Sequence, residues 1–361
     1  MLIFKRCAVG SLAAMICAVA VLCIYKTGNF SVSPQALVCL AAPGILFTQE
    51  PEENKELFVA GSGNIVLNEL TVDEAELPDT EDYGEYLLPQ ITPPPSLTPP
   101  AGAKMLTPLT VRGQSSQTHY GNLYIKNPTT AKIDAKTVLN SKLKWSFDGS
   151  GPEILIVHTH GSESYNPHGG IWWLSSDSSR NLDIKENIVA VGADLARILH
   201  NAGFSVLHST TMYDQPSYSS SYSSALKGIN AYLKQYPSIR VVIDVHRDAM
   251  SNDTTKYKLV SEINGESCAQ LMFVMGTGIS GLSFPNWREN LAFAAKIQTA
   301  VLDRYPTLMR PITITKHRYN QHTTLASVIL EVGTDGNTLE EAKRSISYFG
   351  EVLVDVLAEL K

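Results

Sequence analysis

The feature that most constrains the fold is a regular alternation of short apolar segments and amphipathic segments in the C-terminal part of the chain. Runs such as ILIV, RVVIDV, LMFVM and SVIL alternate with longer segments in which apolar residues recur every three or four positions. This alternation predicts an α/β domain whose mostly parallel sheet is covered by helices on both faces. Ligand and catalytic residues are then expected just beyond the carboxyl ends of the strands.

The boundaries of these elements follow from the same pattern. Strands are predicted at 154–160, 205–209, 239–246, 269–277 and 326–333, and helices at 187–204, 223–237, 288–306 and 339–360. The composition becomes globular from about residue 106, so the catalytic domain is predicted to span residues 106–361.

Residues 1–25 are predicted to form a short cytoplasmic tip and a membrane anchor. The stretch Cys7–Tyr25 is uncharged and about long enough to cross a ~30 Å hydrocarbon layer at 1.5 Å per residue. Lys5 and Arg6 precede it, which favours a cytoplasmic N-terminus and export of the rest of the chain. A cleaved signal peptide is the alternative, but no clean A-x-A site follows the apolar stretch.

Residues 26–105 are predicted to be a disordered stalk. They contain the acidic run VDEAELPDTEDYGEY and the Pro-rich run LLPQITPPPSLTPPAG, which cannot bury enough apolar surface to fold. The formal net charge of −6 provides no basic excess to pair with phosphates, which argues against nucleic acid as a partner.

Three of the predicted strands end in imidazole or carboxylate groups. His160 and Glu163 follow the first strand, His246 ends the third, and Glu331 follows SVIL. Two imidazoles and a carboxylate suit zinc where no thiolate is present, and they leave a fourth position for water, whose pKa the metal would lower to about 7. A carboxyl at the end of so apolar a strand has a raised pKa, which makes Glu331 the predicted general base.

Several residues have alternative interpretations. His158 is two positions before His160 and would share its face on a strand, either supporting the site or packing in the core. Asp183, in SRNLDIKEN, competes with Glu163 for the role of third ligand, or it caps the following helix. Arg247 either clamps an anionic substrate group or pairs with its neighbour Asp248.

The motifs ILIVHTHGSESYNP, VVIDVHRDA, RYNQ and SVILEVGTDGNT, in this order, resemble the stage II sporulation protein P family of endospore-forming bacteria. The resemblance covers residues 106–360. It implies a zinc-dependent N-acetylmuramoyl-L-alanine amidase that cuts peptidoglycan, with a muramoyl-amidase-like fold. The turn HGSE is also similar to the HGNE-type turn of zinc carboxypeptidases, whose fold is related.

The resemblance implies zinc on His160 and His246, with Glu331 as the catalytic acid and base. Arg247 and Asn320, the latter in RYNQ, are predicted to bind substrate. Muramoyl amidases carry a carboxylate ligand in an E-K-x-x-N-like stretch, and the comparable DIKEN places Asp183 four residues before an asparagine. The choice between Glu163 and Asp183 therefore stays open.

The same resemblance implies a place in the cell. Family members remodel the wall during engulfment of the forespore, in a membrane complex with stage II sporulation proteins D and M. The expected location is the cell membrane, with the catalytic domain outside the cytoplasm in the intermembrane space of the sporangium. The alternatives are a zinc carboxypeptidase or endopeptidase that acts only on stem peptides, and an inactive wall-binding scaffold.

Overall fold

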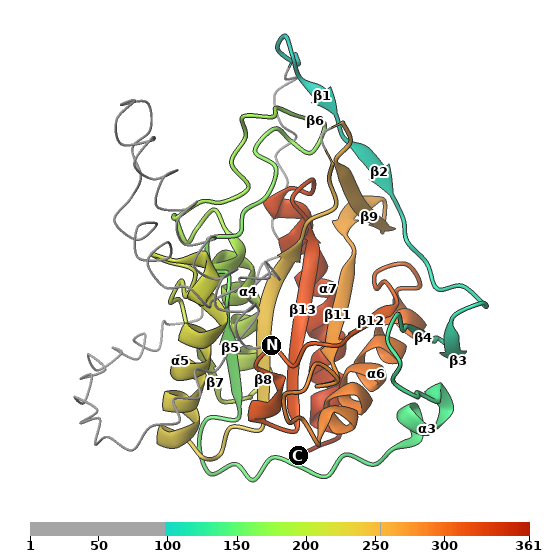
Figure 1. Ribbon diagram of the computed structural model, residues 1–361, viewed down its shortest axis with the longest axis vertical. Coiled ribbons are helices and arrows are strands. Elements are labelled where there is room, and N and C mark those ends of the chain that lie inside the picture. The colour runs from blue at the N-terminus through green and yellow to red at the C-terminus, as the bar shows by residue number, and fades with distance from the viewer. Residues whose placement is uncertain (1–97, 253) are drawn as a thin grey trace, which may run out of the picture. The chain divides into compact units, whose positions relative to one another are not determined.

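The computed structural model describes residues 98–252 and 254–361, which form a large sheet with helices packed against it (Figure 1). The predicted anchor at 1–25 and nearly all of the predicted stalk lie outside the described residues. Strand β1 (Lys104–Met105) pairs with β6 (Trp172–Trp173), so the last two stalk residues contact the domain. Within the described part, no helix is long and apolar enough to span a membrane.

The central sheet has eight strands in the order β3-β4-β12-β11-β13-β8-β5-β7. Most neighbouring pairs are parallel, as predicted. The strands are β3 (Thr118–Tyr120), β4 (Leu123–Lys126), β5 (Ile154–Val157), β7 (Val206–His208), β8 (Val241–Asp248), β11 (Leu271–Gly276), β12 (Ile312–Thr315) and β13 (Ala326–Thr334).

Strand β11 runs antiparallel to β13 and is one of the exceptions in the mostly parallel sheet. The reason is the connection that precedes it. A parallel return requires a crossover of a dozen or more residues, usually a helix. Here β8 leads instead into the hairpin of β9 (Tyr257–Ile263) and β10 (Glu266–Ala269), which pairs with β2 (Thr107–Leu109) in a separate small sheet.

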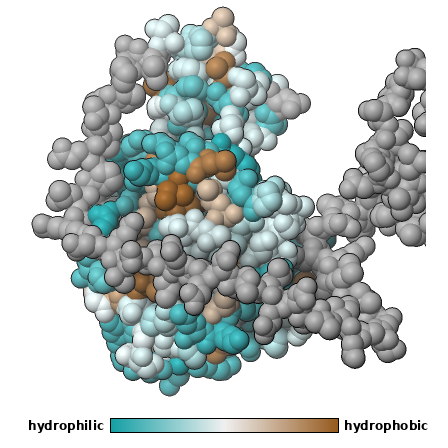
Figure 2. All heavy atoms as spheres, turned by 90° about the vertical axis from the view of Figure 1, so that its left-hand side faces the viewer, coloured by the Kyte–Doolittle hydropathy of each residue, from teal (hydrophilic) through white to brown (hydrophobic). Residues whose placement is uncertain are grey.

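Helices cover both faces of the sheet unequally (Figure 1). Helices α4 (Ile188–Asn201), α6 (Trp287–Arg304) and α7 (Leu339–Ala358) share one large apolar core with the sheet, and α3 (Ala135–Asn140) joins it beside α6. Helix α5 (Ser221–Gln235) packs on the opposite face through a smaller cluster. The side of the molecule that carries α5 is mainly hydrophilic, with a few hydrophobic patches (Figure 2).

The two-residue period of a strand decides which side chains reach each face. In β8, Val241, Ile243 and Val245 join the large core, whereas Val242 packs toward α5. Asp244 and His246 therefore lie on the α5 face, which is the less covered one. The functional groups of β8 and β13 are thus placed on the face of the sheet where, among the described helices, only α5 packs.

Candidate metal and catalytic site

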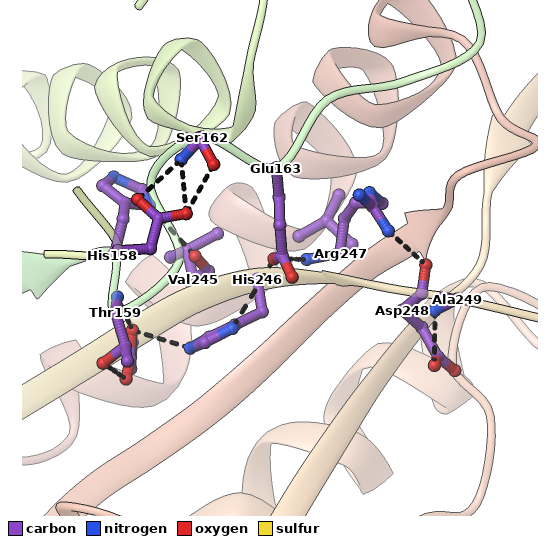
Figure 3. A network of polar contacts seen from close by, with 12 residues as sticks. His158, Thr159, Ser162, Glu163, Val245, His246, Arg247, Asp248 and Ala249 are labelled. Atoms are coloured by element: carbon purple, nitrogen blue, oxygen red, sulfur yellow. Dashed lines mark hydrogen bonds and ion pairs between the residues drawn. The ribbon is translucent and has the colours of Figure 1, made fainter. Parts of the chain in front are cut away.

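The predicted site residues from three strands meet at one edge of the sheet. His246 and Glu331 are direct partners in the parallel pairing of β8 and β13. The turn after β5 brings the His160 ring to 5.3 Å from the His246 ring, measured between centroids. Glu163 Oε2 lies 3.6 Å from His246 Nδ1 (Figure 3). Residues separated by about 170 positions in the chain are therefore neighbours, as the strand-end argument predicted.

The His246 ring is held by Asp244, two residues earlier on the same face of β8. His246 Nε2 lies 2.9 Å from Asp244 Oδ1. The same carboxylate accepts hydrogen bonds from Thr159 N at 2.8 Å and from its hydroxyl at 2.6 Å. Although burial opposes protonation, Asp244 and Glu163 raise the pKa of His246 well above 6.5. The Asp244 carboxylate beside Nε2 orients the ring so that Nδ1 faces Glu163. A carboxylate next to one ring nitrogen is the usual support of a histidine whose other nitrogen binds a metal.

Glu163 is a buried carboxylate with cationic neighbours. Its Oε2 accepts a hydrogen bond from the Arg247 backbone N–H at 3.0 Å, and Arg180 lies 4.0 Å from Oε1. Burial alone would raise the pKa of Glu163, but His246 and Arg247 outweigh it and lower the pKa to about 2. Glu163 is therefore ionised at neutral pH, as a metal ligand must be.

Glu331 has the opposite electrostatic surroundings. Burial raises the pKa of its carboxyl to about 8, with further raising by Asp248 and Glu163 and partial lowering by His246. Its Oε2 is buried and accepts no hydrogen bond from the described residues. A carboxyl poised near neutrality and free of competing bonds suits proton transfer.

These residues supply the donor types that zinc requires, although the side chains do not surround a single point. Among the described residues, no group of three or more His, Cys, Asp or Glu is arranged closely enough to hold a metal as it stands. His160 Nδ1, however, is buried without a hydrogen-bond partner there, which is costly for a polar atom. Two imidazoles with a carboxylate fit zinc chemically, so the residues present suit the metal that the motifs imply.

His158 lies on the other side of the sheet from His160, so the expectation that they share a face is wrong. The reason is that β5 ends at Val157, and the chain turns before His160. His158 is fully buried toward α4, where its Nδ1 lies 3.0 Å from the Val245 carbonyl and its Nε2 lies 2.9 Å from His208 Nε2. His158 and His208 therefore satisfy each other as packed core residues.

The two candidates for the third ligand occupy different environments. Asp183 is exposed in the turn before α4, and its Oδ1 accepts a hydrogen bond from Lys185 N at 2.9 Å. Helix α4 is capped by Asn187, whose side chain accepts from Val189 N. Of these two candidates, Glu163 is the one that lies beside His246, so the geometry brings Glu163 and not Asp183 to the site.

The predicted substrate-binding residues are engaged with the protein itself. Arg247 is buried, and its guanidinium donates to the carbonyls of Ser164 at 2.8 Å, Ser179 at 2.6 Å and Asp248 at 3.2 Å. Asn320 Nδ2 donates to the Tyr222 carbonyl at 2.9 Å. Both side chains position loops around the site, and their contact with substrate stays a prediction.

Sequence reasoning did not identify two aromatic residues next to His160. The Tyr218 ring stacks on the His160 ring at 4.4 Å, and Tyr222 meets it edge-on at 5.4 Å. Both come from the segment YSSSYSS, which joins a short 3-10 helix to α5. Nothing in this polar segment has metal-ligand spacing or apolar periodicity, so no signal in the sequence pointed to it.

Comparison with known proteins gives a family match and several distant structural similarities. The family model of stage II sporulation protein P matches residues 106–354. Stage II sporulation protein P of Bacillus subtilis (strain 168) is 24% identical over 285 residues, which cover 71% of this chain and 67% of that protein.

Two solved structures illustrate the structural similarities. The CwlD amidase from Clostridioides difficile, determined in complex with the GerS lipoprotein, is 15% identical, with a TM-score of 0.37, and 58% of this chain covers all of it. An N-acetylmuramoyl-L-alanine amidase from Clostridium difficile 630 is 14% identical, with a TM-score of 0.32, and 59% of this chain covers all of it. Because these similarities are low, the site residues are assigned from the geometry of this chain alone.

Proposed function

Because the chain belongs to the stage II sporulation protein P family, we propose that it is a zinc-dependent hydrolase that cleaves the amide between N-acetylmuramic acid and L-alanine in peptidoglycan. The observation that carries the proposal is the convergence of His160, Glu163 and His246 beside Glu331, on the face of the sheet that carries α5. Two imidazoles, an ionised carboxylate and a second carboxyl of raised pKa are the groups that hydrolysis of an unactivated amide requires.

In this mechanism His160, Glu163 and His246 would hold the zinc ion. When bound, zinc polarises a carbonyl oxygen and makes water acidic near neutral pH. Glu331 removes a proton from the attacking water and delivers it to the departing amine nitrogen. Its pKa of about 8 in the metal-free protein falls when a dication is adjacent, so the carboxyl can lose and regain a proton at neutral pH. Asp244 keeps the His246 ring oriented throughout.

A stem-peptide carboxypeptidase or endopeptidase is the second candidate, favoured by the His-x-x-Glu spacing of His160 and Glu163. Digestion of purified sacculi separates the candidates. Mass spectrometry of the released fragments should reveal new amino termini on L-alanine. Fragments cut only within the stem peptide, with every lactyl-amide bond intact, would reject the amidase in favour of the second candidate.

The role of Glu331 is tested by Glu331→Gln. Loss of general base catalysis should lower the rate of sacculus hydrolysis by about 10²–10⁴-fold, while zinc stoichiometry measured by mass spectrometry stays unchanged. The matched control is Glu262→Gln, at an exposed position of β9, which should hydrolyse sacculi at the wild-type rate. Normal cleavage by Glu331→Gln would show that another group supplies the base.

The proposed location and partners follow from family membership and the N-terminal sequence. Residues 1–25 would anchor the chain in the cell membrane, with the catalytic domain outside the cytoplasm, where stage II sporulation proteins D and M would assemble with it. Deletion of residues 1–25 from an exported chain should move the protein from the membrane fraction to the soluble fraction. Retention in the membrane fraction would contradict the anchor.

A further inference from the structure

The imidazoles of the candidate site are closed off from solvent. His160 is 6% exposed and His246 is 3% exposed, although a polymeric substrate has to approach them. Tyr218 lies flat against His160, with ring planes 16° apart, yet Tyr218 itself is 57% exposed. The ring of Tyr218 thus separates His160 from solvent.

Tyr218 and its neighbour Tyr222 are held to very different degrees. The Tyr222 backbone carbonyl accepts a hydrogen bond from Asn320, and its ring packs 5.2 Å from the Tyr319 ring. Tyr218 opens a three-residue 3-10 helix that has no side-chain capping bond and contains no buried residue. A segment with so few buried contacts opens at low free-energy cost.

The closed position of Tyr218 depends on contacts with its ring. One is the stacking on His160, and the other is the Arg180 guanidinium, which lies 4.6 Å from the centroid of the Tyr218 ring. Arg180 is fixed by Asp214 at 2.8 Å and by the Ser162 hydroxyl at 3.0 Å. Each of the two ring contacts biases an open–closed equilibrium by a few-fold to about tenfold.

We propose that Tyr218 is a gate over His160, closed in this structure, which swings away from the ring to admit the substrate. Arg180 is the fixed group against which the Tyr218 ring closes, and Tyr222 is a fixed neighbour of the His160 ring. The inference rests on the proposed function, because a gate matters only if His160 takes part in the chemistry. It predicts that His160 becomes accessible by local opening while the rest of the domain stays folded.

The gate is tested by labelling histidines with diethyl pyrocarbonate in the metal-free full chain, with mass spectrometry assigning each modified residue. Tyr218→Ala should label His160 about tenfold faster than the wild type, whereas Tyr218→Phe, which keeps the ring, should label it at the wild-type rate. Tyr120→Ala is the control, because Tyr120 is also exposed and lies in β3. An unchanged His160 rate in Tyr218→Ala would overturn the proposal.

Local opening is distinguished from global unfolding within the same molecule. His158 is fully buried under α4, so its labelling reports opening of the core. In the wild type, His160 should react faster than His158, at a rate nearly independent of low urea concentrations. If His160 and His158 react together with the same urea dependence, Tyr218 is a fixed wall and the gate is rejected.

This labelling needs neither zinc nor hydrolysis, so it decides the gate even if the proposed function fails. A separate zinc titration and sacculus digestion of the wild type decide that function. A functional gate further predicts that Tyr218→Ala takes up zinc faster than wild type and than Tyr120→Ala. Equal uptake rates in the three proteins would reject a gate over the metal ligands.

Discussion

Two pairs of histidines lie on opposite faces of the same sheet edge, and they differ in how their nitrogens are used. His158 and His208 face α4 and contact each other, with Nε2 atoms 2.9 Å apart. His160 and His246 face the opposite way, where His160 Nδ1 has no hydrogen-bond partner among the described residues and His246 lies between two carboxylates. Protein interiors rarely leave polar atoms unsatisfied, so the second pair is the one arranged for a ligand.

Residue type and spacing in the sequence do not distinguish a structural histidine from a functional one in this protein. His158 and His160 are two residues apart and both are buried, and the face of the sheet that each side chain reaches decides its role. Mutations in one pair should therefore alter stability, and mutations in the other should alter metal binding and catalysis.

The largest expected effect is that of His160→Ala on hydrolysis. Metal-ion catalysis contributes several kcal/mol, so loss of a ligand should lower the rate of sacculus hydrolysis by about a thousandfold, with zinc affinity falling in parallel. The matched variant His208→Ala should keep zinc affinity and activity per folded molecule. It should instead lower the free energy of unfolding by about 1–3 kcal/mol, because His158 Nε2 is left buried without a partner. Zinc titration and urea unfolding of both variants check that His160→Ala loses zinc affinity and that His208→Ala loses stability. A His208→Ala protein that loses zinc would contradict the division between a structural and a functional pair.

The fold was largely predictable because its signals are local. Helix α4, predicted at 187–204, spans Ile188–Asn201, and β13, predicted at 326–333, spans Ala326–Thr334. Apolar periodicity and capping residues lie within the element itself. The direction of β11 was not predictable in this way, because it depends on a hairpin between two strands and not on the strand's own residues.

In the candidate site, too, some features were predictable from local sequence signals and others were not. The convergence of His160, Glu163, His246 and Glu331 followed from the rule that parallel strands end at one edge. The separation of His158 from His160 depends on β5 ending at Val157. The apolar run ILIV continues directly into HTH, and nothing in these residues marks where the strand ends. Contacts such as Tyr218 on His160 arise only after distant segments pack, so no local pattern encodes them.

The next largest effect is acid destabilisation through the buried pair. Burial lowers the pKa of His158 to about 4, against an unfolded value of 6.5. A group whose folded pKa is depressed contributes stability above its unfolded pKa and loses it as the pH falls. Between pH 6.5 and pH 4 the metal-free protein should therefore lose about 3 kcal/mol of unfolding free energy from this residue.

Urea unfolding at several pH values measures this loss. The double variant His158→Leu/His208→Leu, which removes both imidazoles from the core, should show a shallower decline than the wild type over the same range. Parallel curves for the two proteins would show that the buried pair does not titrate as its burial implies.

A smaller effect is expected from Gly192→Ala, in the helix that covers the buried pair. A methyl group at Gly192 would lie 2.4 Å from His158 Nε2 and 3.0 Å from His208 Nε2. Overpacking costs about 1–3 kcal/mol, and the better helix propensity of alanine returns about 1 kcal/mol. The net loss of unfolding free energy should be about 0–2 kcal/mol, with zinc binding unchanged. In a His158→Ala background, which opens space, the same substitution should cost less, and equal costs in both backgrounds would show that His158 is not the obstacle.

The smallest effect is expected at Asp183, the rival of Glu163. Asp183 is exposed and contacts only its own turn, so Asp183→Asn should change stability by less than about 0.5 kcal/mol and leave zinc affinity unaltered. Glu163→Gln replaces the ionised carboxylate beside His246 with a neutral amide, and it should lower zinc affinity strongly while both proteins stay folded. Zinc titration of the pair decides between the two carboxylates. If Asp183→Asn loses zinc while Glu163→Gln retains it, Asp183 is the third ligand. The turn before α4 must then fold inward when the metal binds, because Asp183 lies outside the site in this structure.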